Sequence, residues 1–409
     1  MRLSMLSVAG GICALALLPT ASARGLSLEE ALARAALSRF EIAAIPREIR
    51  AGEGRITQAA IKPALELDFE VQNVFEESKV EMIFPHERGG KRDARVASAR
   101  AGLELVGAQA DVRRLEIGHQ VRKAYFAVLA AEQSFALTEA SLSLSRSFAD
   151  TVAEKVRAGA VSPIEETRAA VRLHSASADL ERARREVALA RADLALAVGD
   201  PGVRSEALEG HLPEDTTIPD PAALTAQIDG SSDLKLLERE VLVRRSALAE
   251  ESTQDTRDIA WRVAANYNRL DQEAWATVGV TIPLFAAGRN RGARAAATAD
   301  VERAELEHTA AQRRLAAELE RAAAGLQASA REAAILRSSV LVGAEQAFAT
   351  VQEGYRLGKF PYLDVLDASE VLLAARLQYI GALGALAQAR LDVDRLLGNT
   401  GMPSTTSAR

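Results

Sequence analysis

The sequence has few of the residues that usually hold a compact globular domain together. It contains one cysteine in 409 residues, and aromatic residues make up only 4% of the chain. The cysteine, Cys13, lies in a segment that we expect to be removed, so the mature protein needs no disulfide framework. Alanine, leucine, arginine and glutamate dominate instead, and this composition is typical of long helices and coiled coils.

Several functional classes lack their sequence signals. The arginines alternate with acidic residues and the formal net charge is −6, so no basic block indicates a nucleic-acid partner. The five histidines show no paired ligand spacing: they are His86, His119, His174, His211 and His308. We find no nucleophile elbow, phosphate-binding loop or cluster of catalytic carboxylates. The sequence therefore predicts a protein that is not an enzyme and needs no cofactor or resident metal.

Long apolar runs are also missing from the mature chain. Residues 1–23 combine a positive start, an apolar core and a small-residue cleavage site, which predicts a secretory signal peptide and Arg24 as the first mature residue. The residues before Cys13 match a lipoprotein signal poorly, so we expect no lipid anchor. No later stretch reaches about 18 consecutive apolar residues. The mature chain is therefore expected either to be soluble in the periplasm or to cross a membrane as strands.

The first part of the mature chain changes from a helical to an alternating period. Residues 26–62 are expected to form a helix that Pro46 interrupts or kinks and that Pro63 ends. Two strands are expected over residues 64–85. In the first, apolar and acidic side chains alternate: Leu65, Leu67, Phe69 and Val71 with Glu66, Asp68 and Glu70. Each strand has about the length of a tilted strand that crosses a bilayer.

A long helix follows the strands, and a shorter helix returns beside it. The helical pattern runs without proline over residues 91–157, which is about 100 Å at 1.5 Å per residue, and the return helix is expected over 163–198. A globular core cannot hold a helix of that length. The return helix covers half of it, and the helix over 26–62 has the right length to cover the other half.

The same plan occurs twice in the chain. The copies are offset by 199 residues without a gap, as three glycine pairs show: Gly89 and Gly288, Gly159 and Gly358, Gly199 and Gly398. This indicates a duplicated unit, with repeats at 24–199 and 221–399 around a linker at 200–220. The second repeat is expected to hold a helix at 222–258, strands at 258–285, a long helix at 290–356 and a return helix at 361–397. The tail, 400–409, is expected to be disordered.

The number of strands has a consequence for assembly. One chain supplies four antiparallel strands, and four strands cannot close a membrane barrel, because an open edge in lipid leaves backbone groups without hydrogen bonds. Three copies would give twelve strands and twelve helical staves. The fold class we expect is mainly α with a small β part, in a trimer with a twelve-strand outer-membrane β-barrel on a twelve-helix periplasmic α-barrel.

These features resemble the TolC family of outer-membrane efflux channels. The most specific matches are the segments 354–358 and 363–368 and the strand-to-helix joints at 85–92 and 282–291. Residues 87–92 look like the heavy-metal branch of the family. The resemblance implies a passive trimeric channel in the outer membrane of a Gram-negative bacterium, embedded in its lipid. It also implies a periplasmic adaptor and an inner-membrane resistance-nodulation-division pump as partners, and heavy-metal cations as the cargo.

The resemblance also implies roles for residues at the hairpin tips. Asp364 and Asp367 match acidic residues that ring the periplasmic aperture, and Tyr355 matches the network that holds the tip shut. Asp364 and Asp367 are three residues apart, hence on one helical face, and threefold symmetry would place six carboxylates around one axis, which favours cations. The alternative is that both simply favour the helix start electrostatically, and the two roles can coexist. The first-repeat counterparts, Glu165 and Arg168, are candidates for the same gate network.

Two further groups complete the expected sites. Candidate adaptor contacts lie at the tips: Arg157, Gly159, Arg356 and Gly358. Candidate membrane-interface residues flank the strands: Trp261, Tyr267 and Trp275. Ordinary packing is an alternative for Trp275, which falls on the face opposite Val278 and Val280.

Other functions remain open at this stage. Within the same class, the chain could be an outer-membrane duct for drug efflux or for type I protein secretion. In a different class, it could be a periplasmic adaptor or a structural coiled coil. An adaptor should show one hairpin flanked by β-rich domains, whereas this chain shows two hairpins with amphipathic strands before each.

Overall fold

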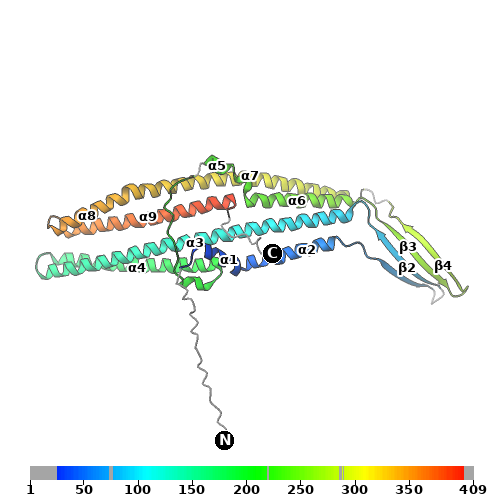
Figure 1. The fold of residues 1–409 in the computed structure, drawn as a ribbon, viewed down its shortest axis with the longest axis horizontal. Coiled ribbons are helices and arrows are strands. Elements are labelled where there is room, and N and C mark those ends of the chain that lie inside the picture. Colours follow the sequence, from blue (N-terminus) through cyan, green and yellow to red (C-terminus); the bar gives the residue numbers. More distant parts are fainter. Residues whose placement is uncertain (1–24, 73–76, 219–220, 285–287, 289, 400–409) are drawn as a thin grey trace, which may run out of the picture.

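The computed structural model describes residues 25–72, 77–218, 221–284, 288 and 290–399. The expected signal peptide, Arg24 and the tail lie outside these residues. The described chain is mainly helical and carries one small antiparallel sheet, as expected from the sequence. Figure 1 shows a long rod of helices with the sheet at one end and the two hairpin tips at the other.

The first long helix, α3, runs over Lys91–Arg157 and has shorter helices along its side. Helix α4 (Pro163–Val198) packs beside its tip half, and α2 (Phe40–Ala59) packs beside its sheet half. The short α1 (Leu28–Ser38) lies between them (Figure 1). Two short helices end to end therefore flank one long helix.

The second half of the chain repeats this arrangement. Helix α7 (Arg291–Ile335) passes through a π-helical segment, η4 (Leu336–Leu341), into α8 (Val342–Arg356). Helices α6 (Ser232–Thr253) and α9 (Tyr362–Leu397) both pack between α3 and α7. Three short helical turns complete the described elements: η2 (Pro201–Ser205), α5 (Pro221–Thr225) and η3 (Ile228–Gly230).

The break in the N-terminal helix is not where the sequence placed it. The chain leaves the helix at Arg39, which is extended, and α2 then continues through Pro46. Arg39 is held there because its guanidinium donates to the carbonyls of Leu196 and Ala197 at the end of α4. The need to satisfy the last carbonyls of a neighbouring helix outweighs the local signal of the proline.

The helix expected over 222–258 is also wrong as a single element. The chain forms α5, η3 and α6 there, and α6 ends at Thr253. Ser231 is fully buried with ψ 135°, because the chain turns under the end of α9, where a Cβ on Gly398 would lie 3.2 Å from Ser232. The break before α6 is therefore set by its contact with the end of α9.

The sheet has four antiparallel strands in the order of the chain. They are β1 (Glu66–Gln72), β2 (Glu77–His86), β3 (Ile259–Asn268) and β4 (Glu273–Thr281). The register aligns Phe69 with Val80, and Val80 with Ala265. Because side chains alternate between faces, most of the large apolar residues of the four strands lie on one side of the sheet, whereas Ile83 and Trp275 lie on the other.

Among the described residues, one helix is long and apolar enough to cross a membrane by length and composition: Leu363–Leu397. Its apolar runs are interrupted by charged residues such as Arg376 and Arg390, so no uninterrupted apolar stretch marks it in the sequence. This segment of α9 packs between α3 and α7, and it buries Leu386 in the main core.

The main core lies at the middle of the rod, where Tyr125 of α3 joins two distant segments. Its hydroxyl donates to the carbonyl of Leu26, at 2.8 Å, and also contacts the carbonyl of Glu209. Leu26 and Leu208 form a parallel bridge beside it. Tyr125 is 2% exposed, and burial raises the pKa of its hydroxyl, which therefore stays a donor.

Removal of this hydroxyl should destabilise the middle of the rod. Tyr125→Phe leaves the ring in place but removes the hydroxyl donor to both carbonyls, of which that of Leu26 keeps a hydrogen bond from the Glu209 amide. The change should cost about 1–3 kcal/mol. Denaturant unfolding of the full chain would measure it. Tyr379→Phe is the control, because the Tyr379 hydroxyl has no hydrogen bond among the described residues, and we expect a change within about 0.5 kcal/mol. Equal effects of the two changes would contradict this role of Tyr125.

Candidate functional site

The two hairpin tips have the same backbone geometry. Each long helix ends at a left-handed glycine, Gly159 with φ 70° and Gly358 with φ 71°. The next amide then bonds back to a carbonyl five residues earlier, from Ala160 to Lys155 at 2.9 Å and from Lys359 to Gly354 at 2.8 Å. This is the hydrogen-bond pattern with which a left-handed glycine ends a helix.

The tips contact each other through non-equivalent residues. The ammonium group of Lys155 in α3 donates to the hydroxyl of Tyr355 in α8 and lies 4.2 Å from the centre of its ring. A small apolar cluster of Val152, Ala169 and Leu366 is buried beside this pair. The tyrosine that the sequence assigned to the tip network therefore joins the first hairpin to the second.

An ion pair also joins the hairpins further from the tips. Arg172 Nε of α4 lies 3.0 Å from Glu370 Oε1 of α9. Sequence reasoning missed Lys155, Arg172 and Glu370. A signal existed for the first: at the 199-residue offset Lys155 matches Gly354, so the repeats differ at the point of contact.

Gly354 is required by the shape of the second tip. A Cβ on Gly354 would lie 2.0 Å from the ring of Phe360, which folds back over the end of α8. Only a residue without a side chain allows this ring position. The contact explains the glycine at the start of the segment 354–358, one of the most specific matches in the sequence.

The aperture candidates lie in the first turns of α9. Asp367 is exposed and Asp364 is half-buried, and neither side chain has a hydrogen bond or ion pair within the described residues. Their position at a helix start suits carboxylates. Both are therefore free to face another chain or the solvent.

The other tip candidates bond within their own helices. Arg168 Nη1 lies 3.0 Å from Glu165 Oε1, so within this chain it does not meet Asp364 or Asp367. Arg157 Nε donates to the carbonyl of Ala153, four residues earlier in the same helix, at 3.3 Å. Arg356 pairs with Glu353 at 2.8 Å in the same way. Exposed pairs of this kind contribute little to stability.

One face of the sheet is a continuous apolar surface in contact with solvent. Each of its large side chains is at least 36% exposed: Leu67, Phe69, Val71, Val80, Met82, Phe84, Trp261, Val263, Tyr267, Val278 and Val280. Trp261 and Tyr267 stand at opposite ends of β3 on this face. Trp275 aligns with Asn266 on the other face, so it does not share the apolar surface.

The opposite face of the sheet is polar. Glu81 is 5% exposed and lies 2.9 Å from Lys79 Nζ and 2.6 Å from Arg262 Nη2. Asn266 donates to Thr277 on the same side, at 3.0 Å. The sheet therefore has one apolar face and one charged face.

Charged residues fix the sheet to the rod. Lys91 Nζ, at the start of α3, lies 2.6 Å from Asp258 Oδ2, just before β3. Arg92 donates to the carbonyl of Ala60 at the end of α2, at 2.7 Å. The second repeat uses Arg294, whose Nη1 lies 2.9 Å from Asp255 Oδ2. The basic residues at both joints therefore have structural partners.

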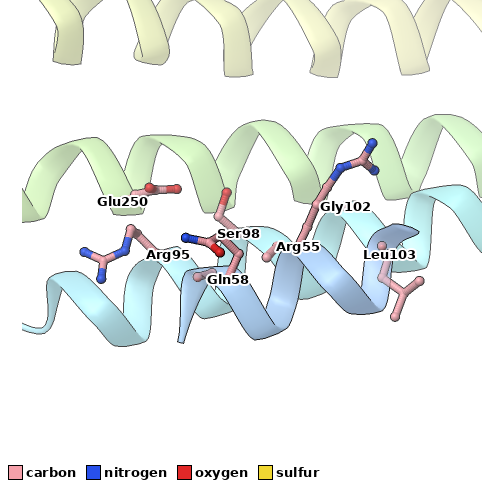
Figure 2. Close-up of a pocket in the computed structure, with 10 residues that line it drawn as sticks. Arg55, Gln58, Arg95, Ser98, Gly102, Leu103 and Glu250 are labelled. Carbon is pink, nitrogen blue, oxygen red and sulfur yellow. The ribbon is translucent and has the colours of Figure 1, made fainter. Parts of the chain in front are cut away.

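A groove of about 410 Å³ lies beside this joint, between α2, α3 and α6 (Figure 2). Small residues such as Gly52, Ser98 and Gly102 line it, together with Arg55, and Figure 2 shows Arg55 extending away from Arg95. Across the described ranges, no group of three or more histidine, cysteine or acidic side chains could hold a metal ion.

The contact between the tips should limit how often they separate. Tyr355→Phe removes the acceptor of Lys155, which should cost about 1 kcal/mol and raise opening of the tips roughly fivefold. The rate of trypsin cleavage after Arg356 and Lys359 would report it.

Arg182→Ala is the matched control for this experiment, because it removes an exposed pair with Asp179 within α4 and should leave cleavage at the second tip unchanged. A Tyr355→Phe protein cleaved at the original rate would show that the contact does not restrain the tips.

Comparisons with known proteins agree with this architecture. The family model described as "Outer membrane efflux protein" matches residues 80–200 and 244–399. The chain is 34% identical over 384 residues to the cobalt-zinc-cadmium resistance protein CzcC of Cupriavidus metallidurans, covering 93% of this chain and 92% of that protein.

Solved structures share the fold. The outer membrane protein VceC of Vibrio cholerae superposes with a TM-score of 0.73 at 18% identity, over 91% of this chain and 96% of VceC. The open MtrE outer membrane channel of Neisseria gonorrhoeae gives a TM-score of 0.74 at 17% identity, over 93% and 91%. With the family match and the close relative, the chain belongs to the outer membrane efflux protein family.

Proposed function

We propose that this outer-membrane efflux channel works as a trimer and carries heavy-metal cations outward. In this proposal a periplasmic adaptor and an inner-membrane resistance-nodulation-division pump deliver the cargo, and the channel itself is passive. The relative with 34% identity is named for resistance to cobalt, zinc and cadmium, and this supports a metal cargo. Because the chain belongs to the outer membrane efflux protein family, the alternative of a periplasmic adaptor is set aside.

The sheet carries the proposal. Its order is β1-β2-β3-β4, so β1 and β4 are edges without a partner strand in the described part of the chain. One face is apolar and exposed, and the other is polar. In a membrane, open edges must be paired, so several copies must join edge to edge. Three copies give twelve strands with the apolar faces toward lipid and the charged faces toward the lumen.

Exposed apolar residues on the helices support the same assembly. Leu196 of α4 is 74% exposed, Leu306 of α7 is 71% exposed and Val371 of α9 is 57% exposed. Neighbouring chains in a twelve-helix barrel would cover such residues. In that barrel, helix α9 would contact helices on several sides, and this would explain why it is apolar enough to span a membrane.

The hairpin tips form the periplasmic end in this proposal. Asp364 and Asp367 ring the aperture, and Tyr355, Glu165 and Arg168 belong to its gate network. The tip residues Arg157, Gly159, Arg356 and Gly358 are the adaptor contacts. The support is the free carboxylates of the two aspartates and the Lys155–Tyr355 contact that ties the second tip to the first.

The orientation of the sheet gives a direct test of membrane insertion. Val278→Arg places a charge on the apolar face, where a lipid-facing arginine costs about 2–4 kcal/mol at mid-membrane. We expect loss of heat-modifiable trimers from outer-membrane fractions. Thr277→Arg, one residue away on the polar face, is the matched control and should still assemble. Normal trimers of Val278→Arg would contradict the proposed barrel.

The aperture is tested by ion selectivity. Asp364→Asn with Asp367→Asn should reduce the preference for cations in planar-bilayer recordings, because six carboxylates leave the ring in a trimer. Glu166→Gln, an exposed acid near the tip of the first hairpin, should change it little. Unchanged selectivity of the double variant would remove the ring from the proposal.

Cargo is tested in cells. A deletion strain that lacks this protein should grow less well on cobalt, zinc or cadmium salts, and expression of the protein should restore growth. Sensitivity to drugs and dyes alone would favour a drug channel, and loss of a secreted protein would favour a type I secretion duct.

A further inference from the structure

The long helix of the second hairpin contains a π-helical segment, Leu336–Leu341. The equivalent stretch of the first hairpin, 137–142, is uninterrupted α-helix within α3. Ser338 and Ser339 stand where the first repeat has Glu139 and Ala140. Serine is a weaker helix former than either, because its hydroxyl competes for backbone hydrogen bonds. Helices bend readily at π-segments and at serine pairs.

The linker between the repeats is bound to the second hairpin at this segment. Arg337 Nη1 lies 3.2 Å from Glu214 Oε2 of the linker. Arg390 of α9 donates to the carbonyls of Asp215, at 3.3 Å, and Thr217, at 3.1 Å. The linker turn is preformed, because the amide and hydroxyl of Thr217 both donate to Asp215 Oδ1. We call residues 214–217 with Arg337 and Arg390 the clasp.

The first hairpin has one half of this arrangement. Arg191, which lies 199 residues before Arg390, donates to the carbonyls of Arg204 and Glu206, both at 2.8 Å. The linker thus crosses the rod bound by an equivalent arginine on each hairpin (Figure 1). On the second hairpin, the linker also binds the π-helical segment, through Glu214 and Arg337. Arg191 is therefore a matched control for Arg390.

The second hairpin is loosely packed on the tip side of the π-segment. Helix α8 buries only Ala344 and Gly354. A cavity of about 130 Å³ separates α3 from α8 and α9, and its lining includes Leu137, Ser141, Phe348, Leu372 and Arg376. Beyond the cavity, the ion pair of Arg172 and the Lys155–Tyr355 contact hold the tips together. Helix α8 itself therefore has few buried contacts to lose if this half moved.

We propose that η4 is a hinge on which α8 and the tip end of α9 swing, and that the clasp restrains it. The clasp lies near the middle of the rod, and by restraining the hinge it sets the position of the second tip. Arg337 and Arg390 are then positioning residues for Asp364 and Asp367. That last step rests on the proposed channel function, whereas the hinge and clasp rest on the chain alone.

Hydrogen exchange of the full mature chain in detergent micelles tests the clasp. Arg390→Ala should raise amide exchange in residues 336–356 roughly fivefold, because the π-segment loses its restraint. Arg191→Ala should raise exchange in the linker at 204–206 and leave 336–356 unchanged. Equal exchange of 336–356 in both variants, or no change in Arg390→Ala, would overturn the clasp.

A stiffened hinge provides the opposite test and does not depend on removing a contact. Ser338→Ala with Ser339→Ala should slow exchange in 336–356, because alanine favours the α-helix. No slowing would overturn the hinge.

Planar-bilayer recordings then test the link to the tip. Arg390→Ala should raise the open probability and Arg191→Ala should not. Faster exchange with an unchanged open probability would reject the positioning role while the hinge stands. If the unmodified chain forms no channel at all, the proposed function fails, and the exchange results still decide the hinge.

Discussion

The structure depends on one packing constraint: a helix of 67 residues must be covered along its whole length. Shorter helices cover α3 in two halves, and where they meet, helix ends lie in the middle of the rod. Each end brings backbone groups without intrahelical partners. Arg39 satisfies the end of α4, and Arg122 donates to the carbonyl of Asn399 just after α9. These arginines of the rod centre are thus a consequence of helix length.

The duplication explains what the two halves share, and its departures show where they differ. The glycine turns, the arginines on the linker and the strand-to-helix joints recur at the same offset. The second copy alone has Tyr355 at its tip, Ser338 and Ser339 in its long helix and an aspartate at 367 in place of Arg168. All of these lie on the tip side of the rod centre, so the hairpins differ where the proposed gate lies.

Local patterns made much of the fold predictable, and long-range contacts set the rest. The strands follow from alternation in residues 65–71, and the tips follow from glycine and proline in each hairpin. The break at Arg39 could not be read from the sequence, because it depends on carbonyls about 157 residues away. The Lys155–Tyr355 contact was equally hidden, since it joins helices that only the tertiary fold brings together. The free state of Asp364 and Asp367 also depends on where Arg168 points.

The two ends of the molecule place opposite demands on stability. At the sheet end, an exposed apolar face and two open edges cost free energy until lipid and other chains cover them, so assembly there is expected to be tight. At the tip end, helix α8 buries two residues and a cavity lies beneath it, so opening there costs little. A channel that must stay embedded at one end and open at the other requires this gradient. The clasp lies near the rod centre, between the tightly assembled sheet end and the weakly packed tip end. A contact at this place can restrain the tip without holding it permanently closed.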